Sequence, residues 1–159
     1  MKTFPVLVAF LFFFVGCSAS GPYFRDTRYA TQQAPADKAR IIFFRESDAN
    51  YRSVTLDIDG ETIGKLASGG FLVEDTTPGA HRIVASISLT LGEFAAKLNA
   101  QAGRIYYIRV SPRYERMLYS FMGDAGTFLT FADNNGYFSL RLVDPAAALV
   151  ALEELQLSE

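Results

Sequence analysis

Short apolar runs separated by turn-forming residues follow one another through the chain after residue 38. Residues 39–45 (ARIIFFR) are apolar on both faces at the centre of the run, which indicates a strand with neighbours on both sides and cover on both faces. Residues 54–58 (VTLDI) alternate strictly, so Val54, Leu56 and Ile58 should point into a core. Both runs therefore predict β-strands.

Two turn sequences indicate how these strands connect. Asp59-Gly60 fits a type I′ hairpin turn, in which both central residues take a positive φ, and this register places Leu56 opposite Ile63. Residues 77–80 (TPGA) fit a type II turn, because proline presets φ and glycine accepts the positive φ that follows. Antiparallel hairpins are the expected result.

The remaining pattern predicts more strands and then one helix. Asp144 can serve as an N-cap with Pro145 at the first helical position, so residues 146–155 should form a short helix. We therefore predict a mainly β fold, an antiparallel β-sandwich with a short C-terminal helix. The other strand-like runs are residues 71–74, 81–89, 94–99 (strand or one helical turn), 104–110, 127–131 and 137–143.

The N-terminus has a different pattern, in which Lys2 precedes the almost uniformly apolar residues 4–15. A helix of that length spans about 18 Å, less than the ~30 Å hydrocarbon core, so residues 1–16 read as a signal peptide rather than a transmembrane helix. Residues 14–17 (FVGC) resemble the bacterial lipobox, although Phe14 stands where an aliphatic residue is usual. The alternative is a plain secretory peptide with a chance cysteine.

The lipobox resemblance makes Cys17, the only cysteine, the predicted lipidation site, carrying S-diacylglycerol and an N-acyl chain such as palmitate. Two or three acyl chains hold a protein on a membrane essentially permanently. Ser18, rather than Asp, follows the cysteine, and this favours the outer membrane, facing the periplasm, over the inner membrane if the source has two membranes. The expected location is the cell envelope.

Residues 17–38 are rich in Ser, Gly, Pro, Gln and Ala and show neither helix nor strand period. We expect an acylated, flexible tether there, followed by a single β-sandwich domain over residues 39–159. Tyr23, Phe24 and Tyr29 interrupt this composition. They predict either transient contact with lipid or with the domain, or a motif for a specific partner.

Composition and charge exclude several function classes. The formal net charge is −2 and no stretch concentrates Lys and Arg, which argues against nucleic-acid binding. His81 is the only histidine, so we expect it to bond to its turn or a neighbouring strand rather than to ligate a metal. Residues 57–61 (DIDGE) begin like a calcium loop but lack its later ligands. We predict no metal, no cofactor and no catalytic residues.

Aromatic and arginine side chains concentrate between residues 104 and 141, and both types are enriched at binding surfaces. Tyr114, Arg116 and Tyr119 are our candidate partner-binding surface; the alternative is that such residues fill and edge the core. The predicted function is a membrane-anchored, non-catalytic binding or assembly module that meets an envelope protein, peptidoglycan or surface glycan. The alternative is an enzyme acting on an envelope polymer, since carboxylate pairs are spatial and cannot be read from sequence.

The same segments carry a family resemblance. In order, ARIIFFR, LDIDGETIGKL, TPGAHRI, AGRIYYIRV and SLRLVD resemble a family of bacterial lipoproteins classed as a domain of unknown function and numbered 2846. The resemblance covers residues 38–144 and departs at residues 111–136, which are longer than usual. It implies a lipid-anchored β domain and brings no catalytic residues.

Overall fold

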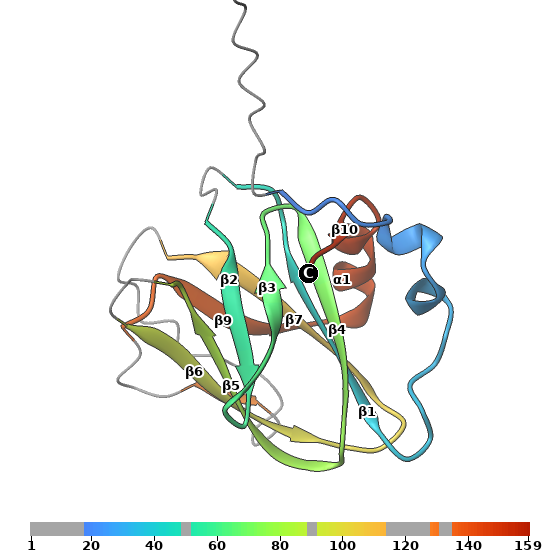
Figure 1. Ribbon diagram of the computed structural model, residues 1–159. Coiled ribbons are helices and arrows are strands. Elements are labelled where there is room, and N and C mark those ends of the chain that lie inside the picture. Colours follow the sequence, from blue (N-terminus) through green and yellow to red (C-terminus); the bar gives the residue numbers. More distant parts are fainter. Residues whose placement is uncertain (1–17, 49–51, 89–91, 114–127, 131–134) are drawn as a thin grey trace, which may run out of the picture.

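The computed structural model is a two-layer β-sandwich with one short helix on its outer side (Figure 1). It describes residues 18–48, 52–88, 92–113, 128–130 and 135–159. Every run that the pattern predicts as a strand contains one, and residues 89, 127 and 131 of the predicted runs lie outside the described residues. The elements are the 3₁₀ helices η1 (Phe24–Asp26) and η2 (Arg28–Ala30), the strands β1 (Ala39–Arg45), β2 (Val54–Ile58), β3 (Glu61–Leu66), β4 (Gly70–Thr76), β5 (Gly79–Ser86), β6 (Glu93–Ala100), β7 (Ile105–Pro112), β8 (Phe128–Thr130) and β9 (Phe138–Val143), the helix α1 (Pro145–Leu152) and the strand β10 (Gln156–Leu157).

The two sheets differ in strand direction. One has the order β3-β2-β5-β6-β8 and is antiparallel throughout, whereas the other has the order β10-β4-β1-β7-β9 and is mixed. In the mixed sheet β1 pairs parallel with β7, and β10 pairs parallel with β4. The mainly β sandwich with a short C-terminal helix is confirmed, while one sheet departs from a fully antiparallel arrangement. The chain passes through the other sheet before β7 returns beside β1 in the same direction.

Strand β1 lies between two apolar layers. Its side chains alternate, so Ile41 and Phe43 join the core between the sheets, while Ile42 and Phe44 join a second core on the outer face of the mixed sheet. All four are 0% exposed. This two-sided cover is the physical reason why β1 is apolar without alternation, as its sequence predicts.

The β2–β3 hairpin has the predicted turn and a register that differs from the prediction. Asp59 and Gly60 have φ of 54° and 87°, as a type I′ turn requires. A β-bulge after Leu56 then shifts the ladder, so Leu56 pairs with Gly64 and not with Ile63. The predicted Leu56–Ile63 pair is therefore wrong, because the bulge places one extra residue of β3 opposite β2.

Helix α1 begins as predicted and ends earlier. The Asp144 carboxylate accepts a hydrogen bond from the backbone N–H of Ala146 at 2.9 Å, and Pro145 is the first helical residue. The helix stops at Leu152 rather than at residue 155, because Leu155 turns into the outer core and the chain returns to the sheet as β10.

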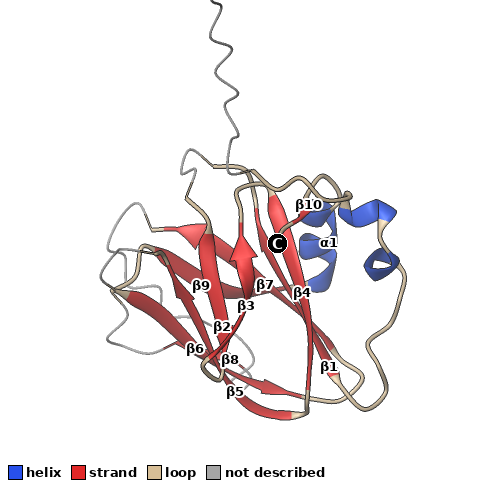
Figure 2. Cartoon of the chain, in the orientation of Figure 1, coloured by secondary structure: helices blue, strands red, loops and turns tan. Residues whose placement is uncertain are grey.

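The largest difference concerns residues 18–38, which we call the N-terminal segment. Its composition predicts a flexible tether, but it packs against the domain: η1 and η2 lie on the same side of the mixed sheet as α1 (Figure 2). Phe24 is 3% exposed and belongs to the outer core. Burial of this aromatic ring and backbone pairing to β10 hold a segment whose composition alone indicates disorder.

Candidate functional site

The N-terminal segment is the candidate site, because it connects the domain to the predicted lipidation residue. Cys17 lies outside the described residues, but its neighbour Ser18 already forms a parallel β-bridge with Ser68, between β3 and β4. The backbone N–H of Ala19 faces the carbonyl of Ser68 at 3.4 Å, and Ala19 is buried. In the described part of the chain, contact with the domain is already present at Ser18, the residue after Cys17.

Beyond Ala19 the segment behaves as an extra edge strand beside β10. The Gly21 N–H donates to the Leu157 carbonyl at 3.1 Å, and the Leu157 N–H donates to the Pro22 carbonyl at 2.9 Å. A Cβ on Gly21 would lie 2.7 Å from that Leu157 carbonyl oxygen, closer than real Cβ contacts allow. Position 21 therefore requires glycine for the segment to pair with β10.

Phe24 holds the middle of the segment. Its N–H donates to the Leu155 carbonyl at 2.8 Å, and its ring meets Phe71 edge to face, with centroids 5.2 Å apart and an interplanar angle of 86°. Edge-to-face pairs at this separation are favourable beyond their apolar burial. The ring also joins Leu152 in the outer core, so the segment, α1 and β4 share one apolar cluster.

An ion pair on β1 holds the other end of the segment. The buried Arg40 guanidinium donates to both carboxylate oxygens of Asp75, at 2.7 and 2.8 Å, and to the carbonyls of Gln32 and Gln33, at 3.2 and 3.3 Å. It also lies 5.1 Å from the centroid of the Tyr29 ring. The hydrogen bond from Arg40 lowers the pKa of Asp75, against the opposing effect of its burial. One arginine therefore joins the segment to β1 and β4.

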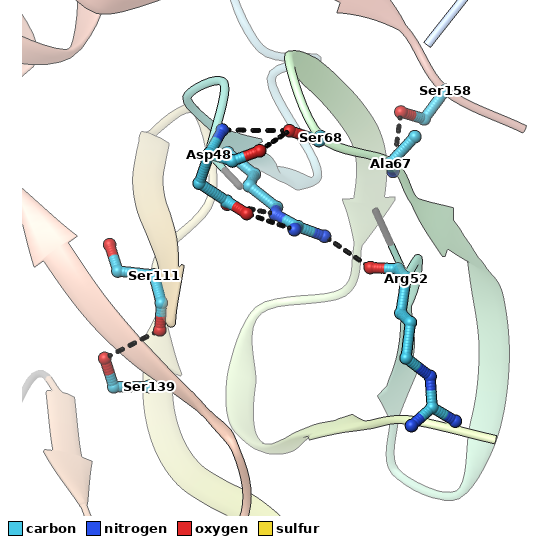
Figure 3. Close-up of polar contacts among 8 residues, drawn as sticks. Asp48, Arg52, Ala67, Ser68, Ser111, Ser139 and Ser158 are labelled. Atoms are coloured by element: carbon cyan, nitrogen blue, oxygen red, sulfur yellow. Dashed lines mark hydrogen bonds and ion pairs between the residues drawn. The ribbon is translucent and has the colours of Figure 1, made fainter. Parts of the chain in front are cut away.

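A polar cluster fixes the loops that receive Ser18. The fully buried Arg45 guanidinium donates to both oxygens of Asp48, at 2.7 and 2.8 Å, and to the Arg52 carbonyl at 2.7 Å. The Asp48 N–H in turn donates to the Ser68 hydroxyl at 3.0 Å (Figure 3). Arg45 thereby holds the loop between β1 and β2, and Asp48 joins this loop to the one between β3 and β4 at the same end of the sandwich.

Ser158 joins the C-terminal strand to the same loop between β3 and β4. Its hydroxyl accepts a hydrogen bond from the Ala67 N–H at 3.2 Å, drawn in Figure 3, and its N–H donates to the Phe71 carbonyl at 2.8 Å. A Cβ on Gly70 would overlap the Ser158 hydroxyl oxygen and lie 2.9 Å from the Ala19 Cβ. Ala19 and Ser158 therefore both pack against the backbone of Gly70, where any larger residue would collide with them.

His81 has the structural role that its position suggests. Its Nδ1 lies 2.7 Å from an Asp59 carboxylate oxygen and its Nε2 lies 2.7 Å from the Thr77 carbonyl oxygen, so it links two turns. The pKa of Asp59 is lowered, first by the hydrogen bond from the Arg82 N–H and then by His81. In the described part of the chain, no three His, Cys, Asp or Glu side chains are arranged to hold a metal ion.

The candidate partner-binding residues Tyr114, Arg116 and Tyr119 lie outside the described residues. Elsewhere in the aromatic-rich region, Tyr106, Tyr107 and Phe138 are buried, which agrees with the alternative that these residues fill the core, whereas Tyr137 is exposed. None of the helices in the described ranges is long and apolar enough to cross a bilayer.

The family described as "Protein of unknown function (DUF2846)" matches residues 35–125, which run from the end of the N-terminal segment to beyond β7. The chain belongs to the DUF2846 family. No curated protein and no solved structure matches it.

The DUF2846 match does not include the contacts that hold the N-terminal segment to β10. Residues 18–34 precede the match, and α1 and β10 follow it. The sequence also did not predict that residues 21–24 form backbone hydrogen bonds with residues 155–157. The available signal was the pair Tyr23-Phe24 within an otherwise small and polar stretch, where an aromatic ring predicts burial more often than exposure.

Proposed function

We propose that this DUF2846 protein is a lipid-anchored envelope lipoprotein, acylated at Cys17, and that its β-sandwich is a non-catalytic binding or assembly module. One observation carries the proposal: the chain is joined to the domain from Ser18 onwards, directly after the cysteine of the lipobox-like sequence. These contacts at the residue that follows Cys17 support a mature chain that begins at Cys17 after removal of residues 1–16.

The use of the buried charged groups supports a binding or assembly module over an enzyme. Arg45 holds the loop between β1 and β2, Arg40 joins the N-terminal segment to the mixed sheet, and His81 links two turns. Each of these groups stabilises the fold through the hydrogen bonds it makes. The partner we propose is an envelope protein, peptidoglycan or a surface glycan, met at the membrane surface.

Mass spectrometry of the mature N-terminus tests the anchor. We expect cleavage before Cys17 and an added mass of diacylglycerol plus one fatty acyl group, with Cys17→Ala blocking both. The matched control is Ser20→Ala, a change at a nearby exposed position that should leave processing unchanged. An unmodified cysteine, or cleavage at another bond, contradicts the proposal.

The membrane location of the protein and its class, binding module or enzyme, need separate measurements. Membrane fractionation of a two-membrane host should find the protein in the outer membrane, and Ser18→Asp should retain it in the inner membrane. Affinity capture of the lipidated protein from envelope fractions should recover a partner in fixed stoichiometry. Hydrolysis of purified envelope polymers by the protein would instead identify an enzyme and refute the non-catalytic role.

A further inference from the structure

The strand pairing divides the sandwich into two ends. Arg45 pairs with Gly70 and Val54 pairs with Leu66 at the end that receives Ser18, whereas Ala39 pairs with Thr76 at the other. We call the first end the anchor rim and the second the far end. The anchor rim comprises residues 18–20, 46–48, 52–53 and 67–70; the far end comprises residues 59–60, 77–78 and 101–104.

The length of chain between lipid and domain is short. Adjacent Cα atoms are about 3.8 Å apart, so the Cys17 backbone lies within one residue of the Ser18–Ser68 bridge. Strand β1 runs between the two ends, and seven residues at about 3.3 Å each separate them by roughly 20 Å. The acyl chains therefore start beside the anchor rim and well away from the far end.

We propose that the anchor rim lies directly against the lipid headgroups and that the far end points away from the membrane. This inference rests on the proposed acylation of Cys17. The N-terminal segment then fixes the orientation of the domain instead of acting as a spacer, because both its ends and its middle are bonded to the sandwich.

The polar groups of the anchor rim fit a headgroup layer. Ser18, Ser20 and Ser47 are exposed hydroxyl-bearing residues there, and the exposed Glu46 carboxylate lies 3.1 Å from the Arg109 guanidinium, which balances its charge. Hydroxyl groups can replace water around phosphate and ester oxygens, since they both donate and accept hydrogen bonds. The anchor rim thus presents polar, charge-balanced surface to the lipid.

Site-specific fluorescence tests the orientation in the lipidated, full-length protein. Acylation blocks the only native thiol, so engineered cysteines can be labelled selectively: Ser47→Cys in the anchor rim, Ala102→Cys at the far end and Val150→Cys on the exposed flank of α1. The labelled proteins are reconstituted into vesicles of phosphatidylethanolamine and phosphatidylglycerol that contain a headgroup-nitroxide lipid as quencher. We expect loss of fluorescence at residue 47 and little loss at residue 102.

Two changes to the N-terminal segment test whether its docking is what holds the anchor rim at the membrane. A Gly/Ser spacer of about 15 residues inserted after Cys17 spans roughly 20 Å and should abolish quenching at residue 47. Gly21→Val should act likewise by displacing the segment from β10. Asp37→Ala, a change at an exposed position of the same segment outside the anchor rim, should leave quenching unchanged.

The outcomes separate the inference from the proposed function. A mature protein without acyl groups overturns both. Acylated protein in which residues 47 and 102 are quenched equally, or not at all, overturns the inference and leaves the anchor intact. Stronger quenching at residue 150 than at residue 47 also overturns it, because the flank of α1 would then face the lipid.

Discussion

Replacement of Phe24 by Ala tests directly whether the N-terminal segment is part of the fold. Phe24 is 3% exposed and its ring packs edge to face on Phe71, 5.2 Å away between centroids. Phe→Ala changes at buried sites cost about 3–5 kcal/mol, to which an aromatic pair adds roughly 1 kcal/mol. The loss cannot exceed the free energy of docking the segment, because a weakened segment can detach while the sandwich stays folded.

We therefore expect Phe24→Ala to lower the free energy of unfolding by about 3 kcal/mol, near the lower end of the range for buried rings. For a chain of this size each kcal/mol lowers the midpoint by about 3 °C, so the midpoint should fall by roughly 10 °C. Thermal unfolding followed by circular dichroism measures this fall. Val150→Ala, a truncation at a side chain that is 76% exposed, is the control and should stay within about 0.5 kcal/mol.

Amide hydrogen exchange gives a second, local measurement. The N–H groups of Gly21, Phe24 and Leu157 donate the hydrogen bonds that join the N-terminal segment to residues 155–157, so they should exchange slowly in the native chain. Phe24→Ala should speed all three together while amides of β1 stay protected. If the midpoint falls no more than in Val150→Ala, and these amides exchange freely in the native chain, then the segment is a tether and our reasoning about it is refuted.

Three further predictions concern other parts of the chain. Gly60→Val should destabilise the domain by about 1 kcal/mol or more through backbone strain alone, because φ is 87° and a Cβ there would meet nothing within 4 Å. Gly60→Asn, which tolerates this φ, is the control, and equal thermal midpoints for the two variants would contradict the turn assignment. The pKa of Asp75 is lowered in the fold by its arginine partner, so its stabilisation is complete above about pH 5 and is lost as the pH falls through and below about 4. Asp75→Asn should reduce stability at pH 7 and weaken its decline between about pH 5 and 3 in urea titrations; an unaltered acid profile would show that the pair is not linked to folding. Replacing Tyr114, Arg116 and Tyr119 together by Ala should abolish partner co-purification with the thermal midpoint nearly unchanged; a sharp fall in the midpoint, or full retention of partners, would make these residues structural.

The hairpin turn and the start of the helix could be predicted from sequence, because each depends only on residues that are neighbours in the chain. The positive φ at Asp59 and Gly60 follows from the chemistry of a two-residue turn, and the bond from Asp144 to the Ala146 N–H follows from capping preference. The predicted β2–β3 register, in contrast, was wrong at Leu56, beyond the turn. The bulge near Leu56 places Gly64 opposite it, and an isolated glycine in a strand only hints at such a bulge.

Non-local pairing explains what could not be predicted. The parallel contact between β1 and β7 joins residues that are more than 60 positions apart, as in Arg40 and Ile105. Gly21 and Leu157 are separated by almost the whole described chain, so nothing near Gly21 indicates its partner. Composition therefore favoured a tether for a segment that pairs with the last strand. The lipidation site, in contrast, is predicted from a local sequence pattern around Cys17 alone.

Under the proposed acylation of Cys17, the docking free energy of the N-terminal segment also determines which partners the domain can meet. If docking contributes about 3 kcal/mol, the released state has a population below about 1%, because every 1.4 kcal/mol is a factor of ten. Release of residues 18–38 would let the domain move roughly 25 Å from its anchor. A partner that binds only the released state must supply this free energy and loses affinity about 100-fold, whereas a partner at the membrane surface loses none. Gly21 is the position at which this balance is most easily changed, since any side chain there opposes the docked backbone without touching the core of the sandwich.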